Sequence, residues 1–469
     1  MKRLHALLMI ILLISVTQSQ TLESVSFPFH GQVQPRHANE IQASPWSVGA
    51  ETMGRDYLVY ANWKEYLGPL GAKKARIQSG WAKTEKEKGV YDWAWMDEIV
   101  FDMHSQGVEP WIDLCYGNPV YPGGGGITLR NKQLPDSAQA LEGWVRYVKA
   151  IVARYKDVVD EWEVWNEPNY RIDDKVYANF LVLTAETVKS VQPDAKILGF
   201  ALGSHVDYKY ADKVLSHIAK WGKVHLIDQV THHRHRPIPE ENEHEIQLER
   251  VLDKYGEHLI ARQGEAGCPS EYSEAFAMNN MPWSELTQSK HILRRMMTDW
   301  GRGKESCIFL IIDAKYMRDG NVIWNRKGLI RATEDKKVDY LKPAYHAMQH
   351  ATSIFDSSLK TIDHYAYAAK NERPLSLYGV ENIYTGQQLV SVWFDDRIPA
   401  ETNEFQNMDF TFYHGRFEQP VYVDLRTGEV YEIPEKNWSR KGSVYTFKDI
   451  PVYDSPVLIA DKSLILIQD

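Results

Sequence analysis

The stretch Glu161-Trp-Glu-Val-Trp-Asn-Glu167-Pro-Asn169 contains the pattern that decides the fold. Its first five residues, Glu161–Trp165, include two tryptophans and a valine and predict a short β-strand, because aromatic and β-branched side chains favour strands. Apolar and small residues then recur at helical spacing, at Val176, Phe180, Leu183, Thr187 and Val191, and Pro193 ends the pattern. A strand followed directly by a helix is the repeating unit of an α/β fold.

The same unit recurs along residues 44–354. The strand-like runs are Pro45–Ala50, Ala75–Gln78, Val108–Leu114, Glu161–Trp165, Lys196–Phe200, Leu226–Thr231, Leu259–Gln263 and Cys307–Ile312. Segments with helical spacing lie between them, and eight such units predict a (β/α)8 TIM barrel. A doubly wound sheet is the competing α/β architecture. It is disfavoured because Gly49-Ala-Glu-Thr-Met-Gly54 matches poorly the Gly-x-Gly-x-x-Gly turn that should follow its first strand.

The pattern changes after about residue 359. Short strand-like runs now alternate with turn signals, as at Leu389–Phe394, Asp409–Tyr413 and Pro420–Asp424, and the helical spacing disappears. This alternation predicts a C-terminal all-β sandwich over residues 359–469. Residues 21–43, which precede the first barrel strand, are expected to add a strand to that sandwich.

Residues 1–20 have the features of an export signal. Lys2 and Arg3 precede an apolar run, Leu7–Val16, which only Ser15 interrupts, and small or polar residues follow it. This run is too short to cross a bilayer core, which needs about 20 apolar residues. We therefore expect a cleaved signal peptide over residues 1–20 and a secreted or periplasmic mature protein that has no membrane partner.

Composition narrows the classes of partner. The 469 residues carry 54 Lys and Arg against 63 Asp and Glu, a net charge of −9, which argues against a nucleic-acid partner because such a protein should carry a basic stripe. Fifteen Trp and 26 Tyr are many, and such rings line sugar-binding clefts as well as cores. Cys115, Cys268 and Cys307 are expected to be buried free thiols, with a Cys268–Cys307 bridge as the alternative.

Two glutamates follow barrel strands at positions that suit catalysis. In a barrel of this kind the chemistry lies at the C-terminal ends of the strands. Glu167 follows the fourth predicted strand and Glu265 the seventh, where Gly264 and Gly267 leave room for a substrate. These strands face each other across the barrel mouth. Two carboxylates about 5–5.5 Å apart perform retaining glycoside hydrolysis, in which one protonates the leaving oxygen and the other attacks the anomeric carbon.

The stretch Trp162–Asn169 resembles the acid/base motif of glycoside hydrolase clan A, and most closely that of family 39 and its relatives. Other segments resemble further parts of the same family, namely Leu70–Arg76, Glu87–Trp93 with Asp97, Asp228–His233 and Gly328–Gln349. The resemblance spans residues 44–354. It implies a retaining glycosidase with an oligosaccharide or polysaccharide substrate. Because two carboxylates perform the chemistry, we expect no cofactor and no metal.

The resemblance also implies roles for particular residues. Glu167 would be the acid/base, Glu265 the nucleophile, and Asn166 a hydrogen-bond partner of the sugar 2-hydroxyl. Arg76 would lie near the site, and His233 would hydrogen-bond the sugar.

Two positions depart from the family pattern. Gly264 stands where the family usually has Thr, and His235 stands where it often has a Tyr that touches the nucleophile. If His235 replaces that Tyr, its N–H should donate to the Glu265 carboxylate.

Other side chains near strand ends have two interpretations. Trp81, Tyr116 and Trp283 are candidate substrate platforms or core residues. Lys315 and Arg318 are candidates for binding an acidic sugar or are solvated loop charges. The histidines at 232, 233 and 235 leave a metal-dependent barrel hydrolase as an alternative. A non-catalytic glycan-binding barrel is another alternative, but both carboxylates that it should lack are present.

Overall fold

Eight parallel strands close into a barrel in the computed structural model, which describes residues 24–129, 133–203, 206–318 and 320–468. The strands are β2 (Trp46–Gly49), β3 (Lys74–Gln78), β4 (Glu109–Leu114), β5 (Glu161–Val164), β6 (Lys196–Leu202), β7 (Gln229–His233), β8 (Ile260–Ala266) and β9 (Ser306–Ile308). The predicted barrel is confirmed. The predicted signal peptide lies outside the described residues.

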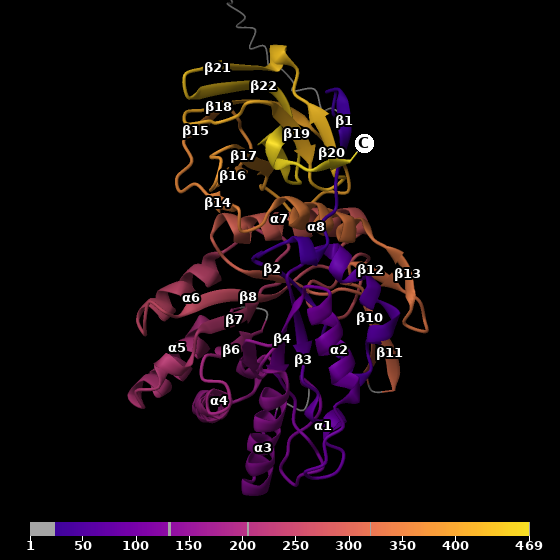
Figure 1. Cartoon of the computed structure of the whole chain (residues 1–469), viewed down its shortest axis with the longest axis vertical. Helices are drawn as coiled ribbons and strands as arrows, with labels where there is room; N and C mark the ends of the chain where they lie inside the picture. Colours follow the sequence, from indigo (N-terminus) through magenta and orange to yellow (C-terminus); the bar gives the residue numbers. More distant parts are fainter. Residues whose placement is uncertain (1–23, 130–132, 204–205, 319, 469) are drawn as a thin grey trace, which may run out of the picture.

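Helices surround the barrel (Figure 1). They are α1 (Trp81–Thr84), α2 (Ala94–Ser105), α3 (Ala138–Tyr155), α4 (Asp174–Lys189), α5 (Tyr208–Lys220), α6 (Glu243–Asp253), α7 (Glu285–Gly301) and α8 (Pro343–Ile354). Local sequence fixes several of their starts. The side chains of Ser137, Asp173, Asp207 and Ser284 each accept a hydrogen bond from a backbone N–H in the first turn that follows.

The eighth strand is shorter than predicted. We expected Cys307–Ile312, but β9 ends at Ile308 because the hydrogen bonding of the backbone changes there. The N–H of Phe309 still donates to Ala266 O of β8, whereas the N–H of Leu310 donates to Lys327 O of a returning segment. That segment connects two hairpins that the sequence pattern did not predict, β10 (Ala314–Arg318) with β11 (Asn321–Asn325) and β12 (Ile330–Ala332) with β13 (Val338–Leu341).

The C-terminal part forms the predicted β-sandwich. One sheet contains, in spatial order, β14 (Leu359–Thr361), β16 (Leu375–Asn382), β17 (Gln388–Phe394), β23 (Val457–Asp461), β19 (Pro420–Asp424), β20 (Glu429–Glu432), β1 (Phe29–Val33) and β24 (Ile467–Gln468). The other contains β15 (Tyr367–Ala369), β18 (Gln406–Phe412), β22 (Val444–Val452) and β21 (Trp438–Lys441). Buried aromatic side chains, among them Phe410, Phe412, Tyr422 and Phe447, belong to the core of this domain.

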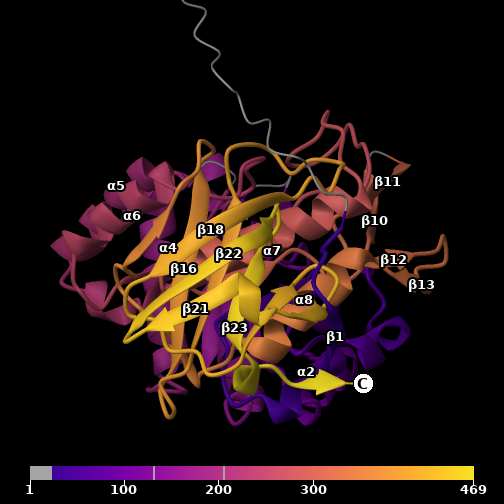
Figure 2. The ribbon, with the colours of Figure 1, turned by 90° about the horizontal axis from the view of Figure 1, so that it is seen from above.

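Helices α7 and α8 lie between the barrel and the sandwich (Figures 1 and 2). Buried polar contacts join the two domains. Lys290 Nζ on α7 lies 2.7 Å from Asp454 Oδ1, and Trp393 Nε1 on β17 donates to Glu240 Oε1 at 2.7 Å. These contacts attach the sandwich to the side of the barrel that carries α7 and α8.

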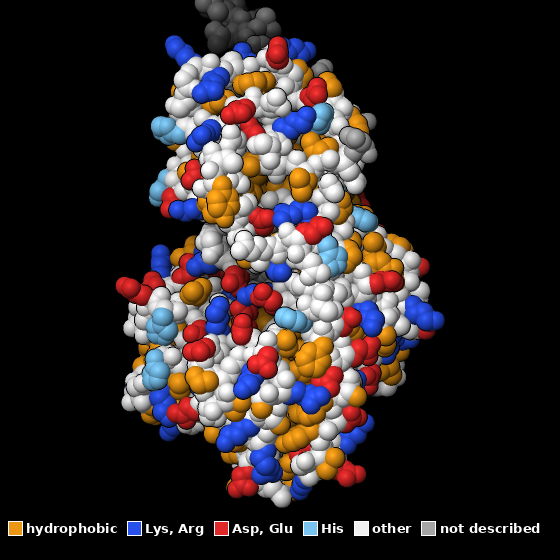
Figure 3. All heavy atoms as spheres, in the orientation of Figure 1, with side chains coloured by type: hydrophobic (Ala, Val, Ile, Leu, Met, Phe, Trp, Pro, Cys, Tyr) orange, Lys and Arg blue, Asp and Glu red, His pale blue; other side chains and the backbone are white. Residues whose placement is uncertain are grey.

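The surface carries charged side chains of both signs. Acidic and basic side chains are interspersed over the face shown in Figure 3.

Cys115, Cys268 and Cys307 are buried and free, so the alternative of a Cys268–Cys307 bridge is wrong. Within the described residues, no helix is both long and apolar enough to span a bilayer.

Candidate active site

A cavity of about 920 Å³ opens at the C-terminal ends of the barrel strands, and we call it the active-site cavity. Glu51, Tyr116 and Glu167, which follow β2, β4 and β5, and Glu265 near the end of β8 contribute to its wall. The β10–β11 hairpin contributes Tyr316, Met317 and Arg318. The position agrees with the rule that barrel chemistry lies at this end of the strands.

Glu167 is held by the backbone at the end of β5. Its φ of 51° and ψ of 53° place it in the left-handed region, which residues other than glycine seldom occupy. Its N–H donates to Ala201 O of β6 at 3.2 Å, and Pro168 starts a 3-10 turn directly after it. Unusual backbone conformations of this kind cluster at functional sites, where the surrounding structure fixes a side chain in position.

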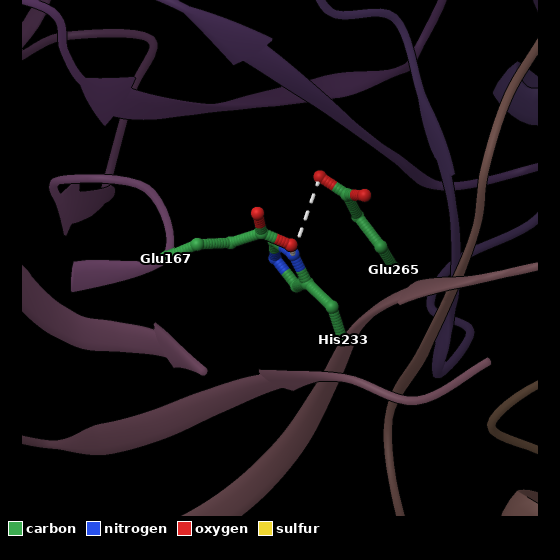
Figure 4. Close-up of side chains that lie close together, drawn as sticks. All are labelled: Glu167, His233 and Glu265. Atoms are coloured by element: carbon green, nitrogen blue, oxygen red, sulfur yellow. Dashed lines mark hydrogen bonds and ion pairs between the residues drawn. The ribbon is translucent and has the colours of Figure 1, made fainter. Parts of the chain in front are cut away.

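The side chains of Glu167, His233 and Glu265 lie close together (Figure 4), and both glutamates line the active-site cavity. His233 Nδ1 on β7 lies 3.0 Å from Glu167 Oε1 and 3.5 Å from Glu265 Oε1. One oxygen of each carboxylate and one imidazole nitrogen all lie within 4.8 Å of one another. The two glutamates are therefore brought together as the sequence predicted.

Arg76, on β3, is the centre of a buried charge cluster beneath this site. Its side chain contacts Glu163 at 2.6 Å, Glu265 at 2.7 Å, Glu51 at 2.9 Å and Asp113 at 3.3 Å, and it donates to Asn166 Oδ1 at 2.9 Å. One guanidinium thus faces four carboxyl groups. A single positive charge cannot balance four negative charges in a buried site, so some of these groups must hold a proton.

The direction of the pKa shifts agrees with this conclusion. Burial raises the pKa of Glu265 well above its usual value, the neighbouring Glu51 carboxylate raises it further, and Arg76 opposes the shift. Burial also raises the pKa of Glu51. The pKa of Asp113 is raised to about 8, again chiefly by burial. The cluster therefore keeps protons at neutral pH.

His233 is fully buried, and burial together with the nearby Arg76 lowers its pKa well below the usual value. The neutral ring can donate to an ionised Glu167 or accept from a protonated one. We expected His233 to bind the sugar, but its Nδ1 lies against the two carboxylates instead. A Cβ at Gly264 would lie 3.3 Å from His233 Cδ2, so the glycine leaves room for this ring where the family usually has Thr.

His235 does not make the predicted hydrogen bond. Its Nε2 lies 4.0 Å from Glu265 Oε2, which is too long for a hydrogen bond. Its Nδ1 lies 2.9 Å from Gly267 O and must carry the proton to donate there. Burial lowers the pKa of His235, so the ring is neutral and Nε2 is left without a proton. The donor to Glu265 is Arg76 Nη1 at 2.7 Å.

The remaining predicted residues divide into two groups. Tyr116 and Asn166 line the active-site cavity, and Asn166 Nδ2 donates to the Tyr116 hydroxyl at 3.0 Å. Trp81 and Trp283 do not line it, so their predicted contact with substrate is corrected. Trp81 is fully buried and stacks with Tyr121 and Tyr147, and its indole donates to Glu85. Trp283 packs against His291, and its indole donates to Met278 O.

Glu51 and Lys327 also line the active-site cavity, although neither was predicted from the sequence. Glu51 directly follows the first predicted strand, so the rule that identified Glu167 and Glu265 could also have found it. Lys327 lies 19 residues after β9 ends, beyond the β10–β11 hairpin, where no local pattern places it at the cavity.

Glu167, His233 and Glu265 are also the types of side chain that bind transition metals, and their spacing would allow a shared ion. Arg76 argues against this use. Its Nη1 already donates to Glu265 Oε1, and a dication bound there would lie close to a buried positive charge. The geometry therefore favours proton transfer and nucleophilic attack by the carboxylates.

Comparison with known proteins agrees with this chemistry. Residues 76–261, which include Glu167, match the model of the glycosyl hydrolases family 39. A family 39 glycoside hydrolase from the gut symbiont Bacteroides cellulosilyticus WH2 is similar with a TM-score of 0.61 and 17% identity, over 89% of this chain and 81% of that one. A monomeric beta-xylosidase from Caulobacter crescentus CB15 is similar with a TM-score of 0.60 and 13% identity, over 93% and 98%.

A third structure, the GH39 enzyme from Xanthomonas axonopodis pv. citri, has a TM-score of 0.56 and 14% identity, over 92% of this chain and 95% of that one. At these identities the structures show a shared fold, and they share it over both domains. The family match adds a likeness in sequence across most of the barrel. The chain is therefore an O-glycosyl hydrolase whose barrel resembles glycosyl hydrolases family 39, as its motifs predicted.

Proposed function

We propose that this protein is an exported retaining glycosidase in which Glu167 is the acid/base and Glu265 is the nucleophile. The observation that carries the proposal is the short separation of the two carboxylates, whose nearest oxygens lie within 4.8 Å. Retaining enzymes place their carboxyl groups about 5–5.5 Å apart, whereas inverting enzymes need about 6.5–9.5 Å to admit a water molecule.

In the first step an oxygen of ionised Glu265 attacks the anomeric carbon and forms a glycosyl ester. The bond from that carbon to the leaving oxygen breaks, and the proton of Glu167 passes to the leaving oxygen. Arg76 supports this step because its Nη1 donates to Glu265 Oε1 and favours the ionised carboxylate.

In the second step Glu167, now ionised, removes a proton from a water molecule while the water oxygen attacks the anomeric carbon. The ester bond breaks, Glu265 leaves as a carboxylate, and the sugar is released with its original anomeric configuration. His233 Nδ1, 3.0 Å from Glu167 Oε1, would carry the ring proton and donate to this oxygen in both states, which leaves the other oxygen of Glu167 to hold and transfer the catalytic proton. The imidazole would thus hold Glu167 in place through both steps.

Export is proposed from the sequence alone. The apolar run at Leu7–Val16, after Lys2 and Arg3, has the length of a signal peptide and is too short to span a bilayer. The expected substrate, a glycan outside the cell, agrees with export.

The nucleophile can be tested by trapping. A 2-fluoro glycoside with a good leaving group slows the second step more than the first, so the glycosyl ester should accumulate. Mass spectrometry of the digested protein should find the added sugar on the peptide that contains Glu265. A label on Glu271 or Glu274 would reassign the nucleophile, and NMR showing inversion at the anomeric carbon of the product would refute the retaining mechanism.

A further inference from the structure

Lys327 is a buried lysine that forms no ion pair with any residue the structure describes. It lies in the segment that connects β11 to β12, is 2% exposed and lines the active-site cavity. Within the described ranges, its Nζ makes no hydrogen bond, and no carboxylate oxygen lies within 4.0 Å of it. The centroid of the Phe276 ring lies 5.8 Å from Nζ, and the Glu265 carboxylate is near enough to oppose the effect of burial, which lowers the pKa of Lys327.

Other buried cations of the barrel differ from Lys327 in this respect. Lys342 Nζ lies 2.7 Å from Asp313 Oδ1, and Arg262 Nη1 lies 2.7 Å from Glu161 Oε2. Burying a charge is costly unless a partner compensates it. The folded protein compensates the charges of Lys342 and Arg262 internally, so the charge of Lys327 is left for a group that enters the cavity.

Arg318 provides a second cation on the same wall. It lies at the end of β10 and lines the cavity, and its guanidinium carbon is 5.5 Å from the centroid of the same Phe276 ring. No ion pair of Arg318 is found among the described residues. The Phe276 ring in turn contacts Tyr316, with centroids 5.0 Å apart. The wall therefore combines two cations with aromatic rings, which pack against the C–H faces of sugars.

Lys315, on the same hairpin as Arg318, differs from these two cations because it has a carboxylate partner. Its Nζ lies 2.9 Å from Glu334 Oε2, and it does not line the cavity. Of the two basic residues that the sequence suggested for an acidic sugar, only Arg318 faces the site. Lys327, which the sequence did not suggest, is the second cation at the cavity wall.

We infer that the sugar next to Glu265 carries an anionic substituent, a carboxylate or a sulfate ester, which Lys327 and Arg318 bind. This inference rests on the proposed function, because it names the class of substrate for the same cavity. The anion would supply the partner that Lys327 lacks, and Phe276 and Tyr316 would hold the sugar ring beside it.

The test uses 4-methylumbelliferyl glycosides in matched sets that differ only at C6, with a hydroxymethyl, a carboxylate or a 6-sulfate group. Comparison of the carboxylate and the 6-sulfate substrates shows whether the enzyme prefers a uronic acid or a sulfated sugar. For the correct sugar, we expect an anionic member to be cleaved at least 100-fold faster, in kcat/KM, than its neutral counterpart. Lys327→Met should remove most of this preference, and Lys327→Arg should restore part of it.

Lys315→Met is the matched control, because it removes a lysine of the neighbouring β10–β11 hairpin that does not line the cavity. It should keep the full preference for the anionic member. Lys327→Met should keep or raise the Tm, because it removes a buried charge that lacks a partner. Equal cleavage of anionic and neutral members by the wild type, or an equal loss on both in Lys327→Met, would overturn the inference.

A binding measurement separates this inference from the proposed function. Calorimetry with the free uronic acids and 6-sulfated monosaccharides should show saturable binding to Glu265→Ala, and no binding once Lys327→Met is added. If no glycoside is cleaved but this binding is found, the anion site stands and the glycosidase proposal fails. If neither is found, the anion site fails as well.

Discussion

The carboxylates of Glu51 and Glu265 share one nitrogen atom. Arg76 Nη1 lies 2.9 Å from Glu51 Oε1 and 2.7 Å from Glu265 Oε1, and both glutamates are almost completely buried. The nucleophile is thus paired with a cation that a second carboxylate also contacts. The two glutamates titrate as a coupled pair, since ionisation of one disfavours ionisation of the other.

Glu51→Gln should move the acid limb of the kcat/KM profile to lower pH. The Glu51 carboxylate raises the pKa of Glu265, and Glu265 must be ionised to attack, so removal of that charge lets Glu265 ionise at lower pH. Rates measured from pH 3 to 8 check this expectation. His235→Phe is the control and should leave the position of the acid limb unchanged, because His235 Nε2 is 4.0 Å from the Glu265 carboxylate. An unmoved limb in Glu51→Gln would show that the two groups do not interact.

Arg76→Met should destabilise the barrel by about 3–5 kcal/mol in the free energy of unfolding, the usual effect of breaking a buried ion pair. The four carboxyl groups would lose their cation, and their pKa values in the folded state would rise further. Groups with raised pKa values bind protons on folding, so the defect should be smaller at pH 5 than at pH 8.

Urea unfolding at the two pH values measures this effect. Arg154→Met, which breaks a more exposed pair with Asp97, should lower the free energy of unfolding by no more than about 1 kcal/mol. If the two variants lose the same amount of stability, the charge cluster does not stabilise the fold.

Glu167→Gln should distinguish substrates by their leaving groups. A poor leaving group needs the proton of Glu167, so its kcat/KM should fall by about 10²–10⁴-fold. A dinitrophenyl leaving group needs no proton, and formation of the glycosyl ester should stay close to the wild-type rate. Stopped-flow measurement of the first turnover tests both substrates, and an equal loss on both would exclude Glu167 as the acid.

Prolonged dialysis against EDTA should leave activity unchanged. Glu167, His233 and Glu265 could ligate an ion by their spacing, but Arg76 already provides the positive charge at Glu265. Assays before and after dialysis, with and without added Zn²⁺, check the expectation. Loss of activity on chelation that Zn²⁺ restores would favour the metal-dependent barrel hydrolase instead.

The sequence alone was sufficient for the barrel, the sandwich and the two central glutamates. Strand and helix spacing is a local property, and in a closed barrel the order of the strands determines where each strand end lies. Glu167 and Glu265 could therefore be placed at one mouth without any knowledge of side-chain packing. The eighth strand was predicted too long, because the backbone of Leu310 leaves β8 to pair with Lys327, which is distant in sequence.

Only the tertiary structure decided how the side chains are used. His233 and His235 are two residues apart, yet the first contacts both glutamates and the second donates to Gly267 O. The same holds for Trp81, which follows a strand as Tyr116 does but is buried in an aromatic cluster. A side chain's partners depend on packing between segments that are distant in sequence, which spacing cannot reveal.

The pairing of charged side chains is also decided by the tertiary structure and not by the sequence. The sequence contains the acids around Arg76 and the lysines after β9, but it does not tell which of them meet. The fold places four carboxyl groups around Arg76 and pairs Lys315 with Glu334. It leaves Lys327 buried at the cavity with no carboxylate oxygen within 4.0 Å among the described residues. Charge pairing acts over a few ångströms, and those distances exist only after the chain has folded.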